Sequence, residues 1–179
     1  MSASFVNKLV VDRDAGYSTQ QYNVYILRYD GNMLAQKNLT KLIEIVYKNF
    51  EEISDNPTLN HTRLEIARLL TSPKGTSIFA VIKGQIVAYL IAEITVIDNL
   101  RQLMHIAYLF TTPVRRGNGI STSMLNFIQL CAQQQNISTL SLSFDTYNKT
   151  LEKFYINNHF VYDSNLRSYQ RYDMMVKYI

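Results

Sequence analysis

The most informative segment of the chain is Leu109-Phe-Thr-Thr-Pro-Val-Arg-Arg-Gly-Asn-Gly-Ile-Ser121. It begins as the end of an apolar, aromatic run typical of a β-strand, and a helical pattern starts at its last residues. Gly117 and Gly119 lie in the turn between them, where glycine permits a positive φ and lets the backbone approach a ligand closely. Because free N–H groups at the start of a helix attract anions, and Arg115 and Arg116 add positive charge, the stretch predicts a phosphate or pyrophosphate site.

Two well-known phosphate-binding turns do not match this stretch. A P-loop requires Gly-Lys-Ser/Thr at the helix start, and a dinucleotide-binding turn requires a third glycine; both are missing. Asp145 follows the next strand, as an acidic residue would in a dinucleotide fold, but the neighbouring antiparallel strands do not suit a doubly wound sheet. From the turn alone, a tight connection that binds nothing stays an alternative.

The patterns on either side of the turn predict a single α/β domain with a mixed sheet. The strands expected at 77–82 and 85–97 are joined by Lys83-Gly84, a hairpin signal, so they are antiparallel. The strands expected before and after the glycine turn are joined by a helix, so they are parallel. The expected elements are strand 22–29, helices 39–50 and 62–70, strands 77–82, 85–97 and 102–112, a helix from about 120, strand 138–144, helix 149–158, and strands 160–163 and 169–178.

The domain is expected to span all 179 residues, because no repeat or linker divides the chain. Residues 1–20 are polar and weakly patterned, which predicts a loose lead-in to a core at about 22–179. The most apolar run, 85–97, is shorter than the ~20 residues that a membrane helix needs, and the start lacks the apolar stretch of a secretory signal. We therefore expect a soluble, cytoplasmic protein without a membrane partner.

The composition is globular, with 47% hydrophobic and 18% charged residues, and the net charge of +4 favours anionic partners. Basic residues do not cluster and no RNA-reading signature is present, so dedicated nucleic-acid binding is disfavoured. The single cysteine, Cys131, lies on the apolar face of a predicted helix and is expected to be buried and unreactive. No metal site is expected, because the three histidines, His61, His105 and His159, are far apart in the sequence.

Two motifs resemble those of the GNAT superfamily of acetyl-CoA-dependent N-acetyltransferases. The first is the acetyl-CoA signature Arg/Gln-x-x-Gly-x-Gly/Ala with a preceding proline; Arg116, Gly119 and Ser121 occupy its fixed positions, with serine where glycine or alanine is usual. The second is the family's Asn…Phe-Tyr-x-x-x-Gly-Phe stretch, which 148–160 resembles with His159 in place of glycine. The order of elements is also the family's, and the resemblance covers about 22–179.

This resemblance implies a GNAT-like mixed, mostly antiparallel sheet of about six to seven strands flanked by helices. A splayed parallel strand pair would form the CoA cleft, and acetyl-CoA would be the co-substrate. The backbone of Leu109, Phe110 and Thr111 would pair with the pantetheine amides. Asn148 would contact the cofactor, although it could equally cap its helix. The residues implied at the pyrophosphate are Arg115, Arg116, Gly117, Asn118, Gly119, Ile120 and Ser121.

The resemblance also implies direct attack of an amine on the thioester, with Tyr155 at the position of the family's general acid. The alternative for Tyr155 is a core tyrosine. His105 lies at the position where some members carry a glutamate that acts as the general base. It could instead be a strand histidine that is solvated or hydrogen-bonded within the protein. Glu93 on the neighbouring strand competes for the role of base, Tyr108 could line the same cleft, and a water chain could also remove the proton.

The expected acceptor is a primary amine on a small molecule or a peptide, entering past the helical pair at 39–70. Glu51, Glu52 and Asp55 could attract a cationic amine such as a lysine, a polyamine or an aminoglycoside, and a peptide N-terminus stays equally open. Two other functions are alternatives: a catalytically silent acyl-CoA-binding module of the same fold, and a basic nucleic-acid-binding protein. The expected assembly is a monomer or a homodimer.

Overall fold

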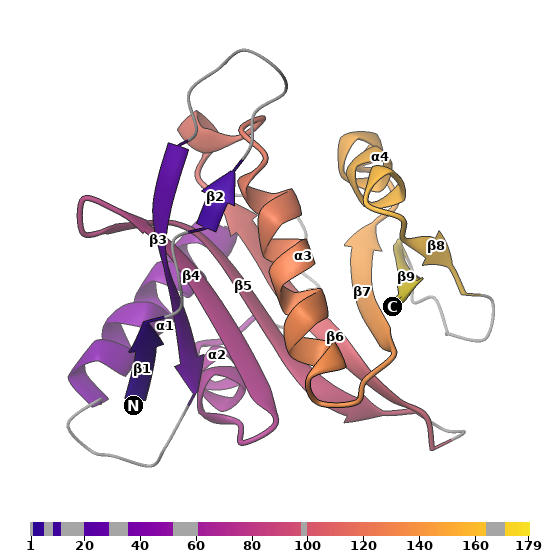
Figure 1. The fold of residues 1–179 in the computed structure, drawn as a ribbon, viewed down its shortest axis with the longest axis horizontal. Helices are drawn as coiled ribbons and strands as arrows, with labels where there is room; N and C mark the ends of the chain where they lie inside the picture. Colours follow the sequence, from indigo (N-terminus) through magenta and orange to yellow (C-terminus); the bar gives the residue numbers. More distant parts are fainter. Residues whose placement is uncertain are drawn as a thin grey trace.

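The computed structural model describes residues 2–5, 9–11, 20–28, 36–51, 61–97, 100–163 and 171–179, with side chains from residue 38 onward (Figure 1). No helix in this part of the chain is long and apolar enough to cross a membrane. The strands are β1 (Ser2–Phe5), β2 (Leu9–Val11), β3 (Gln20–Arg28), β4 (Gly75–Ile82), β5 (Gln85–Val96), β6 (Gln102–Thr111), β7 (Thr139–Asp145), β8 (Val161–Tyr162) and β9 (Tyr172–Tyr178). The helices are α1 (Gln36–Glu51), α2 (Arg63–Thr71), α3 (Ile120–Gln133) and α4 (Lys149–Asn157), and a 3₁₀ turn (Pro113–Arg115) precedes α3.

One mixed sheet contains the described strands, in the order β1-β3-β4-β5-β6-β7-β9-β8, and β2 also pairs with β3. Of the described strand pairs, β6 and β7 are parallel and the others are antiparallel. The GNAT-like fold predicted from the sequence is therefore confirmed. All seven expected strands are present; β1 and β2 are additional and lie within 1–20, where a loose lead-in was expected. These two short strands gain their hydrogen bonds from β3, which a local sequence pattern cannot reveal.

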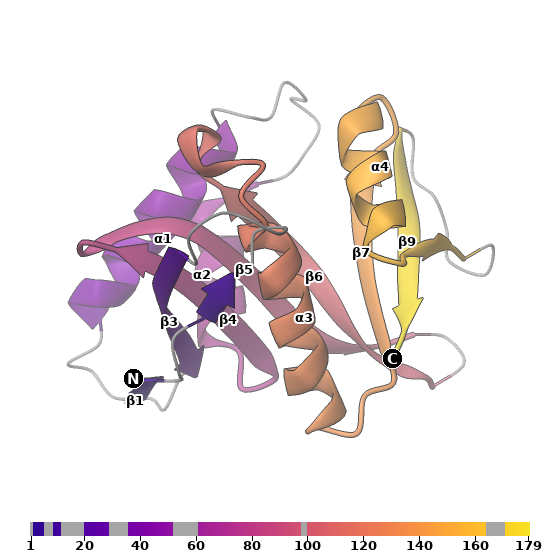
Figure 2. The same ribbon diagram turned by 45° about the horizontal axis from the view of Figure 1, so that its top comes forward.

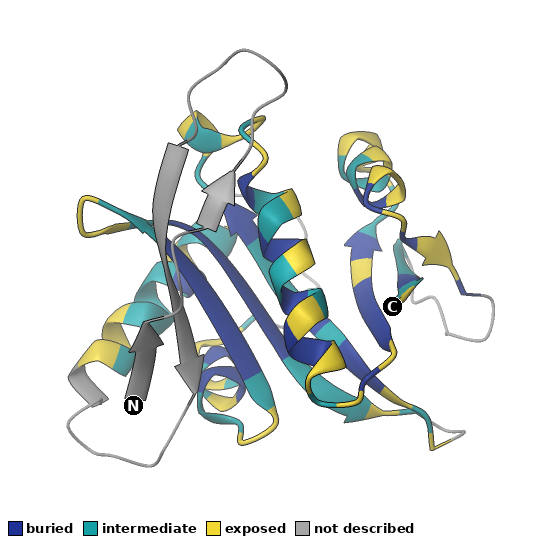
Figure 3. Cartoon of the chain, viewed as in Figure 1, coloured by how far each residue is buried: buried dark blue, intermediate teal, exposed yellow. Residues whose placement is uncertain are grey.

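Helices cover both faces of the sheet, with α1 and α2 on one face and α3 and α4 on the other (Figures 1 and 2). Thr62 caps α2 because its side chain accepts a hydrogen bond from the Glu65 N–H at 3.1 Å. Under α1 and α2 lies a core that includes Val46, Ile66 and Tyr89. The core on the α3 face contains Met124, Leu125, Ile128 and Cys131, so the cysteine is buried as expected, and the central strands are buried between the two layers (Figure 3).

The parallel pair at the centre of the sheet is short. Only Met104–Ile106 of β6 pair with Leu140–Leu142 of β7, although β6 continues to Thr111. Directly after the last paired residue, β6 carries a bulge: Ile106 pairs with Ala92 and Tyr108 with Ile91, so Ala107 is the extra residue. Beyond this point the two strands diverge (Figure 2), which confirms the splayed pair that the resemblance implied.

Candidate active site

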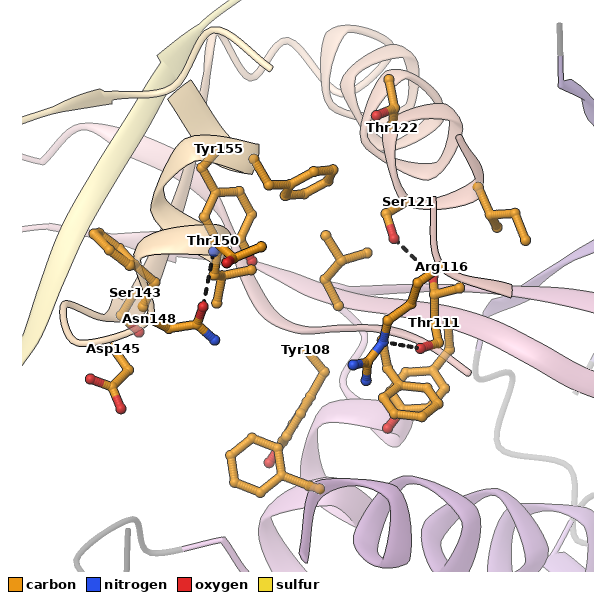
Figure 4. A pocket seen from close by; sticks show the side chains of 18 of the residues that line it. Tyr108, Thr111, Arg116, Ser121, Thr122, Ser143, Asp145, Asn148, Thr150 and Tyr155 are labelled. Carbon is orange, nitrogen blue, oxygen red and sulfur yellow. Dashed lines mark hydrogen bonds between the residues drawn. The ribbon is translucent and has the colours of Figure 1, made fainter. Parts of the chain in front are cut away.

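A cavity of about 1000 Å³ lies where β6 and β7 separate. It is bounded by the second half of β6, the turn before α3, the start of α3, the end of β7 and the inner face of α4 (Figure 4). Twelve of the fourteen residues that the sequence analysis assigned to the site line it: Leu109, Phe110, Thr111, Arg115, Arg116, Gly117, Asn118, Gly119, Ile120, Ser121, Asn148 and Tyr155. His105 and Glu93 do not.

The turn before α3 presents backbone N–H groups to the cavity. Gly119 is the N-cap of α3 at φ 73° and ψ 0°, a left-handed conformation that favours glycine, and Gly117 also has φ 73°. The Ser123 N–H donates to the Gly119 carbonyl at 3.0 Å, so the N–H groups of the preceding helical residues have no partner within the helix. Ile120, Ser121 and Thr122 line the cavity, which places the positive end of the helix against it.

Side chains of the turn hold its shape. The hydroxyl oxygens of Thr111 and Ser121 lie 2.8 Å apart, and Arg116 Nε donates to the Thr111 carbonyl at 3.1 Å. Asn118 Nδ2 donates to the Arg115 carbonyl at 3.1 Å. Serine at the last signature position therefore ties the start of α3 to the end of β6, which accounts for its presence where glycine or alanine is usual.

The second half of β6 has one edge that no described strand covers. Leu109, Phe110 and Thr111 pair with β5 on one side, whereas β7 has already diverged on the other. An uncovered strand edge carries N–H and C=O groups that a ligand with amide groups can pair with. Because these residues line the cavity, the edge forms one of its walls.

Tyr155 projects from α4 into the opposite wall (Figure 4). Its ring packs edge-on against three phenylalanines, and burial raises the pKa of its hydroxyl above the ordinary value of about 10. The three phenylalanines are Phe144, Phe154 and Phe160, with ring centroids 6.2, 5.3 and 5.7 Å from that of Tyr155.

Asn148 caps α4, because its side chain accepts a hydrogen bond from the Leu151 N–H at 3.0 Å. Since Asn148 also lines the cavity, its amide nitrogen remains as the group that could donate to a ligand.

The two residues proposed as the base lie outside the cavity lining. His105 Nδ1 is 3.1 Å from the Ser141 hydroxyl on β7, and burial lowers the pKa of its imidazole. Glu93 is opposite His105 on β5 and accepts two hydrogen bonds from the Arg68 guanidinium, at 2.6 and 3.0 Å. The structure thus brings His105 and Glu93 together with each other, but not with Tyr155.

Aromatic side chains line the end of the cavity beside α1, and the sequence analysis did not assign them as a group. Phe50, Tyr89 and Tyr108 contribute to the lining there. Tyr108 contacts His61, a residue whose place in the sequence, just before α2, gave no signal of a site. The opposite rim carries Arg171, which forms an ion pair with Asp145.

The described residues show no group of histidine, cysteine and acidic side chains that could hold a metal ion. Of the acidic residues expected to attract a cationic acceptor, Glu51 lies at the exposed end of α1, whereas Glu52 and Asp55 lie outside the described residues.

Comparison with protein families matches residues 39–160 to the Acetyltransferase (GNAT) family. The chain belongs to the GNAT acetyltransferase family. It is therefore an acyltransferase of a family that uses acetyl-CoA. A comparison with curated proteins gave no match.

Solved GNAT structures share the fold at low sequence identity. The GNAT domain of S. lividans PAT has a TM-score of 0.68 and 14% identity, over 97% of this chain and 96% of that one. Tetrahymena GCN5 has a TM-score of 0.62 and 17% identity, over 86% of this chain and 94% of that one. The PaiA N-acetyltransferase of Thermoplasma acidophilum was solved with coenzyme A. It has a TM-score of 0.60 and 15% identity, over 88% of this chain and 99% of that one.

Proposed function

We propose that this GNAT protein transfers the acetyl group of acetyl-CoA to a primary amine, and that the cavity between β6 and β7 binds both substrates. The observation that carries the proposal is the continuity of this cavity, which extends from the start of α3 to Tyr155. A helix N-terminus at one end suits a phosphorylated ligand, and a protonated phenol at the other suits a leaving thiolate.

The walls of the cavity fit CoA part by part. The uncovered edge at Leu109, Phe110 and Thr111 would pair with the amides of the pantetheine arm. The N–H groups of residues 117–121 would hold the pyrophosphate, with the positive charge of Arg115 and Arg116 beside them. A volume of about 1000 Å³ lies at the upper end of the range of small-molecule sites, as a ligand of this size requires.

The transfer would proceed by direct attack. The neutral amine forms a bond to the thioester carbonyl carbon, the carbon–sulfur bond breaks, and the sulfur takes the proton of the Tyr155 hydroxyl. A tyrosine phenol is protonated at neutral pH, and burial at this position keeps it so, so the hydroxyl has a proton to donate. Asn148 would donate its amide N–H to the cofactor while its oxygen caps α4.

The acceptor would enter at the aromatic end of the cavity, beside α1. Phe50, Tyr89 and Tyr108 line this end. The acceptor class proposed is a primary amine, carried by a small molecule or by a peptide.

Calorimetric titration with acetyl-CoA, followed by thiol-release assays against amines, peptides and aminoglycosides, tests the proposal. Saturable binding with thiol release for one amine class supports it and names the acceptor. Binding without release for every acceptor would instead favour the catalytically silent acyl-CoA-binding module. Absence of binding would overturn the assignment of the cavity to CoA.

A further inference from the structure

Tyr108 and His61 form a hydrogen-bonded pair at the acceptor end of the cavity. The Tyr108 hydroxyl lies 2.7 Å from His61 Nδ1, although the two residues are 47 positions apart. Tyr108 lines the cavity and follows the bulge residue Ala107 directly, whereas His61 lies one residue before the cap of α2. The pair therefore connects the cavity to a group that lies behind its wall.

Aromatic neighbours fix the His61 ring in place. The ring of Phe50 lies 4.1 Å away between centroids, and that of Tyr47 is stacked at 5.4 Å with an interplanar angle of 10°. His61 Nε2 is buried and makes no hydrogen bond to any described residue. A ring held in this way keeps Nδ1 directed at the Tyr108 hydroxyl.

The surroundings keep both groups uncharged at neutral pH. Burial lowers the pKa of His61, opposed by the Tyr47 carbonyl and the Glu51 charge on α1. Burial, with a smaller effect of Glu65 on α2, raises the pKa of Tyr108 to about 12. Neutral imidazole accepts a proton and neutral phenol can relay one, so the pair has the protonation states that proton removal needs.

The acidic side chains on β5 and at the end of β7 that lie near the cavity are already paired with arginines. Glu93 is held by Arg68, and Asp145, which does line the cavity, is held by Arg171. The Tyr89 hydroxyl is directed to the Val46 carbonyl at 3.5 Å. Tyr108 is thus the cavity-lining hydroxyl with a basic partner behind it.

We infer that Tyr108 and His61 remove the proton from the acceptor amine; this inference rests on the proposed acetyl transfer. As the amine nitrogen bonds to the thioester carbon, its proton passes to the Tyr108 oxygen, and the phenol proton passes to His61 Nδ1. The carbon–sulfur bond then breaks, and the sulfur takes the proton of Tyr155. His61 afterwards returns its proton through the Tyr108 hydroxyl to solvent in the cavity, and Tyr155 regains one from solvent, so the proton count balances over a cycle.

Two variants separate proton transfer from simple packing. Tyr108→Phe keeps the ring and its contacts but removes the relay. His61→Asn keeps an acceptor oxygen near the position of Nδ1, and therefore the hydrogen bond, but cannot take up a proton. We expect each to lower kcat for the best amine about 100-fold, within the range for general acid–base catalysis, with acetyl-CoA affinity changed less than threefold.

The pH profile supplies a second readout. In the unchanged chain kcat/KM should fall on the acidic side as His61 becomes protonated, and this limb should be absent in His61→Asn. The charged or titratable neighbours that face the pair are Tyr47 and Glu51 on α1, Glu65 on α2 and Tyr89 on β5, and all remain in the variant. The matched control is His159→Asn, at an exposed position outside the cavity, where asparagine tolerates the positive φ of 66°.

The outcomes distinguish this inference from the proposed function. If the unchanged chain releases no thiol with any amine, the acetyl transfer itself fails. If the chain is active and Tyr108→Phe retains more than a third of its kcat, the proton pathway is overturned while acetyl transfer stands. Full activity of His61→Asn with an unchanged pH profile would overturn the role of His61 in the same way.

Discussion

The hydroxyl oxygens of Thr111 and Ser121 lie 2.8 Å apart and join the end of β6 to the first turn of α3. Thr111 is buried, and its carbonyl also accepts a hydrogen bond from Arg116 Nε at 3.1 Å. One residue thus fixes both ends of the glycine turn. The position of the free helical N–H groups relative to the strand edge depends on these two contacts.

Replacing Ser121 with alanine separates the contribution of its hydroxyl to stability from any contribution to acetyl-CoA binding. We expect Ser121→Ala to lower the free energy of unfolding by about 1 kcal/mol, because the Thr111 hydroxyl loses its partner. Acetyl-CoA affinity should change less than threefold, since the methyl group still permits close approach. Denaturant unfolding and calorimetry measure the two quantities. A tenfold loss of affinity at unchanged stability would show that the hydroxyl itself contacts the ligand.

Gly119 offers a test of the pyrophosphate site. Gly119→Val should weaken acetyl-CoA binding at least tenfold while the domain stays folded, because a β-branched residue resists φ 73° and its side chain stands at the start of α3. The matched control is Gly84→Val in the β4–β5 hairpin, which has φ 78° and open space around it. Equal affinity in both variants would remove the turn from the binding site.

Tyr155→Phe tests the general acid. The phenyl ring preserves the packing against Phe144, Phe154 and Phe160, so acetyl-CoA binding should not change, while kcat should fall about 100-fold. Tyr162→Phe is the control, because Tyr162 bonds Glu152 on the exposed side of α4 and does not line the cavity. A fully active Tyr155→Phe protein would show that another group protonates the sulfur.

His159 replaces the glycine of the family motif and takes φ 66°, where a residue with a Cβ is strained by about 1–2 kcal/mol. Glycine would relieve the strain but lose about 0.5–1 kcal/mol in conformational entropy. We therefore expect His159→Gly to stabilise the domain by about 0.5–1 kcal/mol, or about 1–4 °C in Tm. Thermal unfolding measures it. A lower Tm would show that the imidazole makes a stabilising contact.

His105 should make the domain sensitive to acid. Burial lowers the pKa of His105 in the folded state, so the unfolded chain binds the proton first as the pH falls. The free energy of unfolding therefore falls as the pH drops from the ordinary histidine pKa of about 6.5 to the lowered pKa of His105 in the folded state. His105→Gln, which can keep the bond to Ser141, should flatten the decline in the free energy of unfolding between pH 7 and 5. An equal decline in the variant would contradict this, and His159→Gln serves as the exposed control.

Features that depend on local backbone chemistry were accessible from the sequence. The hairpin at Lys83-Gly84, the cap at Asn148 and the glycine turn each rest on residue types that restrict φ or supply a hydrogen bond within a few positions. The assigned residues 115–121 and Asn148 line the cavity because they lie in such segments.

What the sequence could not reveal depends on contacts between distant segments. Glu93 is bonded to Arg68 across 25 positions, and no pattern on β5 indicates this partner. The Tyr108–His61 pair joins residues 47 positions apart, and Tyr108 directly follows the bulge of β6. A bulge has no fixed sequence signature, so the run through Ala107 read as an uninterrupted strand.

The bulge is also a feature that evolution could remove in a single step. Deleting the single codon for Ala107 would restore a regular ladder between β5 and β6, since Ile106 and Tyr108 already pair with consecutive residues of β5. The alternation of side chains on either side of the deletion would continue undisturbed, with Ile106 and Leu109 on the α3 face and Tyr108 on the other. A lineage could therefore lose the bulge in one mutational step and keep both hydrophobic layers.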